Sequence, residues 1–157
     1  MIRTLKTLST LLVAVFAVLQ VSAQGMSNAA ISHELTPEAG LQPGQQALLK
    51  ITMKLEPGYH VYSANQVEDA EMMATTFQLD EEASGIELLG SLTDKGEKET
   101  EFDDVFGFNL SFYHKEVVFY QKVKVTSANP QLVGYMRYQV CDDSRCVPGT
   151  YDIEEAL

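Results

Sequence analysis

The two cysteines of the chain, Cys141 and Cys146, are the residues whose type and spacing could do chemistry. Four residues separate them, and Pro148-Gly149, which predicts a turn, follows shortly after. Two thiols this close can form a disulfide in an oxidising compartment, and that bond either holds a hairpin together or exchanges with another protein. The residues alone leave open a structural disulfide, an exchanging disulfide, and a metal site or free thiols.

The loop between the cysteines is too short for a disulfide there to add much stability. A Cys141–Cys146 bond closes a loop of six residues, for which the chain-entropy estimate is only ~2 kcal/mol. A domain of this length can bury enough apolar surface without such a bond. The weak stabilising effect therefore leaves room for a redox role without proving one.

The charged neighbours of the cysteines predict restrained reactivity. Asp142 and Asp143 lie inside the loop, and the acidic pair at 103–104 could come near it. Negative charge disfavours a thiolate and raises the pKa of a thiol, whereas Arg145 acts in the opposite direction on Cys146. We expect thiols that stay protonated and react well only when a docked partner changes the local field.

The N-terminus predicts the compartment. Arg3 and Lys6 precede an apolar run over residues 8–19, and Val21-Ser22-Ala23 offers small residues for cleavage after Ala23. This pattern is typical of a secretory signal peptide over residues 1–23. The run is too short for a comfortable membrane span, so we expect residues 24–157 to form one exported periplasmic domain with no stable membrane insertion.

The charge balance excludes some classes of partner. Removal of the signal peptide leaves nine basic against 22 acidic residues, a net charge of about −13. So acidic a surface argues against nucleic acid and anionic membranes as partners. It fits a protein that meets other proteins.

The pattern after the signal peptide predicts an all-β fold. Apolar and polar residues alternate most clearly over residues 45–56, a period of two that is typical of strands. Gln121 interrupts the apolar face of a long strand, which predicts a bulge or a change of burial there. Residues 67–73 predict a loop or helical turn, and residues 90–107 a polar loop. The expected strands are 29–35, 45–56, 59–63, 75–79, 86–89, 112–126, 132–140 and 150–153.

About eight short strands without an amphipathic helix favour a β-sandwich, with a barrel as the alternative. Cys141 should end one strand and Cys146 should begin the return strand. The cysteines are too close in sequence for an immunoglobulin core disulfide. A thioredoxin fold would need βαβ units and a Cys-x-x-Cys motif, which the sequence lacks.

Three segments of the sequence together resemble those of one known family. The run Tyr-Gln-Val-Cys-Asp-Asp at 138–143, followed by Cys-Val-Pro at 146–148, resembles the active-site hairpin of the N-terminal domain of DsbD, a bacterial transmembrane thiol:disulfide interchange protein. Pro-Gly-Tyr-His-Val-Tyr at 57–62 is similar to its aromatic strand. Asp-Asp-Val-Phe-Gly at 103–107 resembles its cap loop, which has an Asp-Glu-Phe-Tyr-Gly pattern. The resemblance covers roughly residues 31–153.

The resemblance implies an immunoglobulin-like β-sandwich with a redox-active cysteine pair and no cofactor. Domains of this family take electrons from a thioredoxin-like domain that is fed by a membrane domain. They reduce periplasmic thiol oxidoreductases, such as disulfide isomerases and cytochrome c maturation factors. The given sequence has neither a membrane domain nor a thioredoxin-like domain after the sandwich, so we expect a separate reductase as donor.

The resemblance also implies roles for individual residues. Cys146 would exchange with the partner, and Cys141 would resolve the mixed disulfide. Val105 stands at the position of the cap phenylalanine and Phe106 at that of the tyrosine, so shielding would fall to Phe106. Four residues separate the cysteines, where the best-known members have five. The implied cap residues are Asp103, Asp104, Val105 and Phe106, and the implied neighbours of the pair are His60, Tyr62, Asp142 and Asp143.

A non-catalytic immunoglobulin-like interaction module with a structural hairpin disulfide is the alternative function. A metal site is not expected, because His60 and His114 show no ligand spacing with the cysteines and Met72-Met73 fits a loop or core role better. The aromatic residues Phe102, Phe106, Phe108 and Phe112 fit either core packing or a cap.

Overall fold

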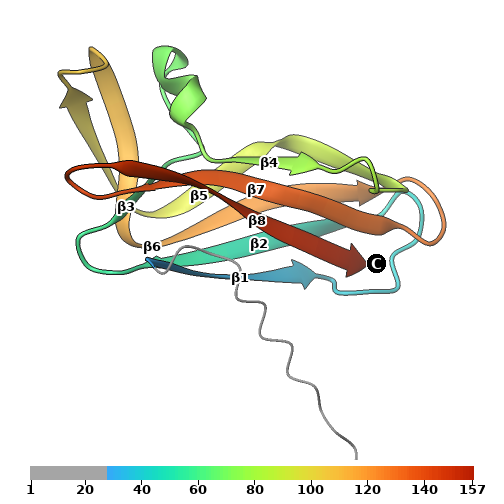
Figure 1. Cartoon of the computed structure of the whole chain (residues 1–157). Coiled ribbons are helices and arrows are strands. Elements are labelled where there is room, and N and C mark those ends of the chain that lie inside the picture. The colour runs from blue at the N-terminus through green and yellow to red at the C-terminus, as the bar shows by residue number, and fades with distance from the viewer. Residues whose placement is uncertain (1–27) are drawn as a thin grey trace, which may run out of the picture.

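The computed structural model describes residues 28–157 as eight antiparallel strands and one short helix (Figure 1). The signal-peptide prediction for residues 1–23 lies outside the described residues. Within them, no helix is long and apolar enough to cross a membrane. The elements are β1 (Ala29–Thr36), β2 (Gln46–Leu55), β3 (His60–Tyr62), the 3₁₀ helix η1 (Glu68–Met73), β4 (Thr76–Leu79), β5 (Ile86–Asp103), β6 (Phe108–Val125), β7 (Gln131–Cys141) and β8 (Cys146–Ala156).

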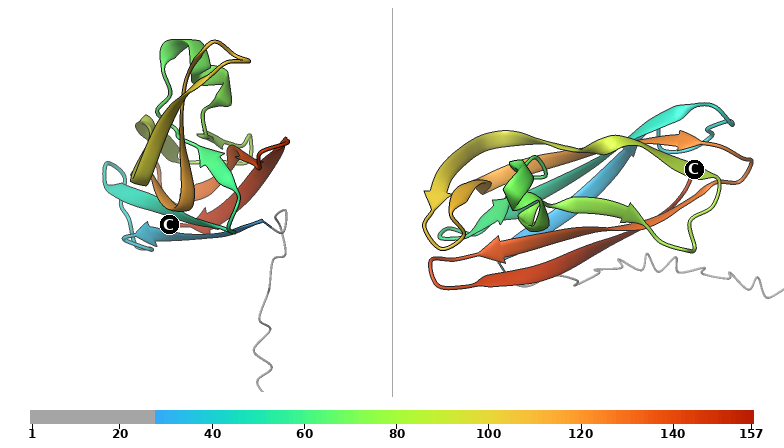
Figure 2. Two further views of the ribbon diagram at one scale, coloured as in Figure 1. Left: turned by 90° about the vertical axis from the view of Figure 1, so that its left-hand side faces the viewer. Right: turned by 90° about the horizontal axis from the view of Figure 1, so that it is seen from above.

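The strands form two facing layers, which confirms the predicted β-sandwich. β1, β2, β6 and β5 make one layer, and β8, β7 and β4 make the other (Figures 1 and 2). β3 pairs with both β6 and β7, so the backbone ladder continues from one layer into the other. The sandwich is therefore one sheet that folds over on itself at β3.

The core follows from the period of two in the sequence. On β2, Leu49, Ile51 and Met53 are fully buried, and the residues between them face outward. Their cross-strand partners on β6 include Phe119 and Val117, which are also fully buried. The same parity from both layers places these side chains in one apolar core.

Gln121 keeps its place in the core, and the irregularity predicted there lies in the neighbouring strand. β6 pairs with β2 in unbroken register through Gln121, whose side chain is 1% exposed. The register of β5 against β6 shifts between Leu89 and Thr93 instead. This bulge turns the carbonyl oxygens of Leu89 and Gly90 towards the Gln121 amide, which donates to them over 3.4 and 3.2 Å.

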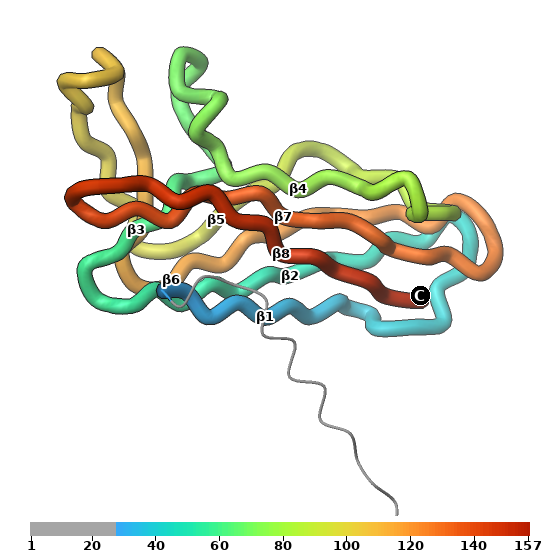
Figure 3. The backbone as a smooth tube through the Cα atoms, viewed as in Figure 1, coloured from blue at the N-terminus to red at the C-terminus, as the bar shows by residue number. Residues whose placement is uncertain are grey.

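The prediction of a polar loop over residues 90–107 was wrong for most of its length. β5 continues to Asp103, and β6 begins at Phe108, earlier than predicted. Residues 93–101 of β5 are polar or glycine on both faces, so this stretch shows no period of two, and its pairing with β6 alone defines it as a strand of the β5–β6 arm. The arm projects beyond the body of the sandwich (Figure 3). Only residues 104–107 form its turn.

The predicted turn at Pro148-Gly149 is also wrong, because both residues lie within β8. Pro148 is tolerated there because β8 pairs only with β7 among the described strands. Gly149 pairs with Tyr138, and a Cβ at Gly149 would approach the Tyr138 ring to 2.6 Å. Glycine is required at this point because the ring covers the strand.

A buried carboxylate fastens β3 to the arm. Asp94 lies in β5, and its side chain is only 1% exposed. It accepts hydrogen bonds from the Ser63 hydroxyl at 2.5 Å, the Ala64 amide at 2.6 Å and the Tyr113 hydroxyl at 2.6 Å. The Lys98 ammonium lies 2.9 Å away. The residues that follow β3 are thereby tied to both β5 and β6.

We expect Asp94→Asn to lower the free energy of unfolding by about 2 kcal/mol at pH 7. Although burial opposes ionisation, hydrogen bonds from Ser63, Tyr113 and Lys98 lower the pKa of Asp94 from 3.8 to about 2. This stabilisation is present above the unfolded-state pKa and is lost as pH falls through the folded-state value. Urea unfolding at pH 7 and between pH 4 and pH 2 measures it.

The exposed strand residue Asp152 supplies the matched control, Asp152→Asn. The free energies of unfolding of Asp94→Asn and Asp152→Asn should converge as the pH falls towards 2. An Asp94→Asn protein as stable as the control at pH 7 would contradict the role of the network.

Candidate active site

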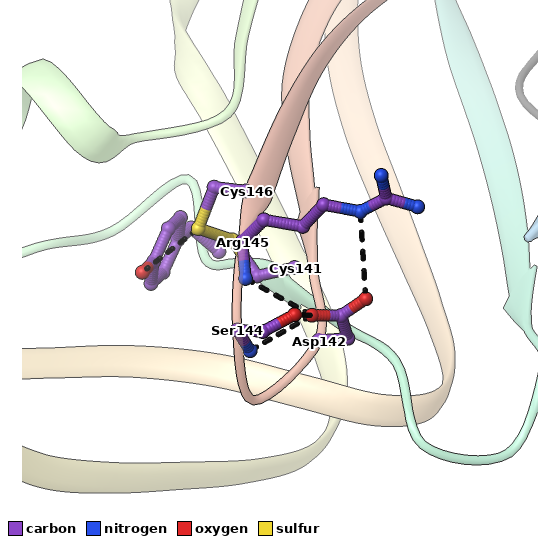
Figure 4. The surroundings of a disulfide bond; sticks show 6 residues. Cys141, Asp142, Ser144, Arg145 and Cys146 are labelled. Carbon is purple, nitrogen blue, oxygen red and sulfur yellow. Dashed lines mark hydrogen bonds and ion pairs between the residues drawn. A yellow bond between two sulfur atoms is a disulfide. The ribbon is translucent and has the colours of Figure 1, made fainter.

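The two cysteines form a disulfide between adjacent strands. β7 ends at Cys141 and β8 begins at Cys146, as predicted, and the two residues are directly opposite in the ladder (Figure 4). Their Cα atoms are 4.0 Å apart and the sulfur atoms 2.00 Å. The Asp142 amide donates to the Arg145 carbonyl across 2.9 Å and closes the turn. The hairpin therefore sets the cysteines side by side through its backbone.

The Asp142 carboxylate is engaged within the turn. One oxygen accepts from the Ser144 amide at 2.8 Å, the Ser144 hydroxyl at 2.6 Å and the Arg145 amide at 3.0 Å (Figure 4). The other oxygen lies 3.7 Å from the Arg145 Nε. The hydrogen bonds from Ser144, followed by those from Arg145, lower the pKa of Asp142. Asp143, in contrast, is exposed.

The two sulfur-bearing residues differ sharply in their access to solvent. Cys141 is 1% exposed and packs with Tyr62 and Phe112 in a small second core, whereas Cys146 is exposed. The Tyr62 hydroxyl lies 3.8 Å from the Cys146 sulfur. Burial, and then the charge of Asp103, raise the pKa of Tyr62, so its hydroxyl keeps the proton that it offers to this sulfur. A partner can reach Cys146 but not Cys141.

A cavity of about 540 Å³ joins the cysteine hairpin to the tip of the β5–β6 arm. Asp103 and Phe106 line it from the arm, but Asp104 and Val105 are not among its lining residues. Phe106 stacks on Phe108, with ring centroids 5.8 Å apart, and is 47% exposed; Val105 is 88% exposed. Of the four predicted cap residues, two therefore face the disulfide across this cavity.

Asp103 shapes the turn that presents Phe106. Its carboxylate accepts hydrogen bonds from the Val105 amide at 2.8 Å and the Phe106 amide at 3.0 Å. Its carbonyl accepts from the Gly107 amide at 2.7 Å, and Gly107 has a positive φ of 80°. The pattern Asp-x-x-x-Gly thus encodes the turn at the tip of the arm. This turn fixes the position of Phe106.

Some residues of the cavity were not predicted from the sequence as site residues. Glu101, Leu110 and His114 line it, as do Phe102 and Phe112, for which the sequence left core packing and a cap role open. Their positions depend on pairing between β5 and β6, since the register sets 101 opposite 110 and 99 opposite 112. Recognition of residues 90–107 as a strand and turn would have identified them.

The predicted neighbours His60 and Tyr62 do lie beside the disulfide. Both line the cavity with Cys141 and Cys146, and His60 is the direct cross-strand partner of Cys141. The His60 ring centroid lies 5.0 Å from that of Phe112 and 5.6 Å from that of His114. Within residues 28–157, no three His, Cys, Asp or Glu side chains are grouped to hold a metal ion.

Comparison with known proteins decides the family. The family described as thiol:disulfide interchange protein DsbD, N-terminal, matches residues 31–157. The chain belongs to this family. The family membership that the three sequence motifs predicted is thereby confirmed.

Two solved structures are similar to this domain. The crystal structure of the N-terminal domain of Neisseria meningitidis DsbD in the reduced form has a TM-score of 0.39 and 18% identity, over 69% of this chain and 78% of that one. The yeast GGA1 GAE domain has a TM-score of 0.41 and 11% identity, over 86% and 96% of the two chains. No curated protein matches the chain.

We expect Phe106→Ala to speed the reduction of the disulfide by dithiothreitol by about threefold or more, because access to the sulfur limits exchange. Phe106 lines the cavity that leads to the disulfide, so its loss opens that route. Val105→Ala is the matched control, since it also truncates an apolar residue of the same turn. Equal rates for the two variants would contradict a shielding role for Phe106. Stopped-flow reduction at fixed pH gives the rates.

Proposed function

We propose that residues 24–157, exported by a signal peptide over residues 1–23, carry reducing equivalents in the periplasm by thiol–disulfide interchange. The observation that carries this proposal is the contrast within one disulfide. Cys146 is exposed beside a cavity, whereas its partner Cys141 is buried. A reagent needs one accessible sulfur for attack and one protected sulfur for resolution. A purely structural bond needs neither.

The exchange proceeds through a mixed disulfide. A thiolate of the reduced donor attacks the Cys146 sulfur, and Cys141 leaves as a thiolate that takes up a proton. The second thiol of the donor then attacks its own mixed-disulfide sulfur and releases Cys146, so the donor is oxidised and the pair is reduced by two electrons. In the next cycle Cys146 attacks an oxidised acceptor, and Cys141 displaces the acceptor to restore the disulfide.

Membership of the family supports redox partners for this domain. The donor is a thioredoxin-like or membrane DsbD-type reductase, and the acceptors are periplasmic thiol oxidoreductases, among them disulfide isomerases and cytochrome c maturation factors. The acidic surface supports protein partners rather than nucleic acid. The Asp103–Phe106 turn shields the disulfide until a partner docks, and Asp104 and Val105 contribute to the turn without lining the cavity.

An exchanging pair should titrate between about −180 and −270 mV, as ordinary oxidoreductases do. Equilibration with glutathione or dithiothreitol buffers, followed by alkylation and mass spectrometry, measures the potential. A structural disulfide typically lies below about −300 mV. A value in that range, together with no transfer from a reduced thioredoxin-like donor, would favour the alternative of a non-catalytic interaction module.

Trapping tests the roles of the two cysteines. Cys141→Ser should accumulate mixed disulfides with periplasmic proteins, because Cys146 can still attack and nothing resolves the product. Cys146→Ser should accumulate few, since Cys141 is 1% exposed. Non-reducing gels of cells quenched with acid show the adducts. Equal trapping by both variants would remove the assignment.

A further inference from the structure

A row of four side chains crosses four strands at the active site. Cys146 on β8 pairs with Cys141 on β7, which pairs with His60 on β3. The β3–β6 register, in which Val61 is opposite Tyr113, continues to bring His60 opposite His114. The two imidazole centroids are 5.6 Å apart. Directly opposed residues of antiparallel strands point to the same face, with Cβ atoms about 5 Å apart. The row therefore runs from the disulfide to the second histidine.

The row leads from a buried thiol to solvent. Cys141 is 1% exposed and His60 is half-buried, whereas the His114 side chain is 43% exposed. His114 Nε2 lies 4.0 Å from the Glu99 carboxylate, and its Nδ1 lies 3.3 Å from the Tyr59 carbonyl oxygen. All four members of the row line the same cavity. Solvent exposure thus increases along the row from Cys141 through His60 to His114.

The exchange reaction needs such a route. In every cycle Cys141 must gain a proton when it leaves Cys146 and lose one when it attacks the mixed disulfide. Bulk water reaches Cys141 poorly, and the acidic residues around the cavity oppose its ionisation. A neutral imidazole beside the thiol is the usual group for transfer of a proton near neutral pH.

We propose that His60 is the proton acceptor and donor of Cys141, and that His114 passes the proton between His60 and solvent. In the oxidising half-cycle, neutral His60 takes the proton of Cys141 as its sulfur attacks Cys146 and the partner leaves as a thiolate. In the reducing half-cycle, protonated His60 returns a proton to the departing Cys141 thiolate. This proposal rests on the exchange function above.

The groups that face His60 support a neutral imidazole at pH 7. Burial, and then the nearby His114, lower the pKa of His60 from 6.5. The charges of Asp143, Asp142 and Glu101, from the hairpin and from β5, act weakly in the opposite direction. The other titratable or charged groups that line the cavity are Tyr62, Asp103 and Arg145.

The test isolates the step in which Cys141 acts. Reduced protein is mixed with 5,5′-dithiobis(2-nitrobenzoate), so that Cys146 forms a mixed disulfide and Cys141 then releases a second thionitrobenzoate, followed at 412 nm. In the wild type, the second release should rise with pH to a plateau with its inflection below 6.5. His60→Gln should slow it at pH 7 by about tenfold or more. The inflection should then move above about 8.5, the pKa of a free thiol, because the buried Cys141 has to ionise unaided among acidic groups.

Three further variants separate proton transfer from packing. His60→Tyr keeps an aromatic ring against Tyr62 and Phe112 but supplies no base, and it should be as slow as His60→Gln. His114→Gln should move the inflection to higher pH, because His114 lowers the pKa of His60. His33→Gln changes the remaining histidine of the chain, which contacts Tyr151 and Glu155 and does not line the cavity, and should leave the profile unchanged.

A wild-type rate and pH profile in both His60 variants would overturn the proposal. The outcome is independent of the proposed function, because the thionitrobenzoate reaction involves no protein partner. A domain that fails to accept electrons from a thioredoxin-like donor, yet shows His60-dependent release, would contradict the carrier function and retain the proton route.

Discussion

The double pairing of β3 is the constraint on which the active end of the molecule depends. This strand has only three residues, yet it pairs with β6 on one edge and with β7 on the other. It therefore joins the two layers and sets His60 and Tyr62 beside the cysteine hairpin. So short a strand contributes few hydrogen bonds of its own. The Asp94 carboxylate secures the residues just after it, and the β5–β6 arm and the disulfide keep a fixed relation in consequence.

Charge near the disulfide is divided between groups that are paired and groups that are open. Asp142 is ionised and hydrogen-bonded within the turn, and Asp94 is held among donors some distance along the arm. Glu101, Asp103 and Asp143 remain on the cavity wall. Their negative charge opposes the thiolate form of both cysteines in the free domain. Under the proposed function, a docking partner that covers these groups or pairs with them would relieve that opposition, which would restrict exchange to proteins with a complementary surface.

The sequence predicts those parts of the fold in which burial differs between the two faces of a strand. β2, β6 and β7 alternate apolar and polar residues, and their existence, the hairpin and the positions of both cysteines were predicted correctly. β5 was missed beyond Leu89 because its projecting part is polar on both faces, so only its pairing with β6 shows that it is a strand. The bulge or change of burial predicted at Gln121 was misplaced for a similar reason. The hydrogen-bond partner of Gln121 is the backbone of a bulge in another strand, which the local sequence does not show.

The candidate site was predictable to the extent that a local motif encodes it. The turn from Asp103 to Gly107 and the residues His60 and Tyr62 were singled out from such motifs. The sequence did not predict that Phe106 lines the cavity and Val105 does not. The two are adjacent apolar residues, and the direction of each side chain depends on the backbone of the turn. The approach of His114 to His60 depends on register across β3 and β6, which no short segment of sequence specifies.

The directly opposed positions of the cysteines in the β7–β8 ladder have a further consequence for the resistance of the protein to proteolysis. The strands around Cys141 and Cys146 are already joined by their backbone ladder and by the turn hydrogen bond between Asp142 and Arg145. Breaking the sulfur–sulfur bond therefore frees no length of chain. Under the proposed function, the domain would alternate between its two oxidation states without exposing a segment of chain to proteases, so repeated turnover would not shorten its survival.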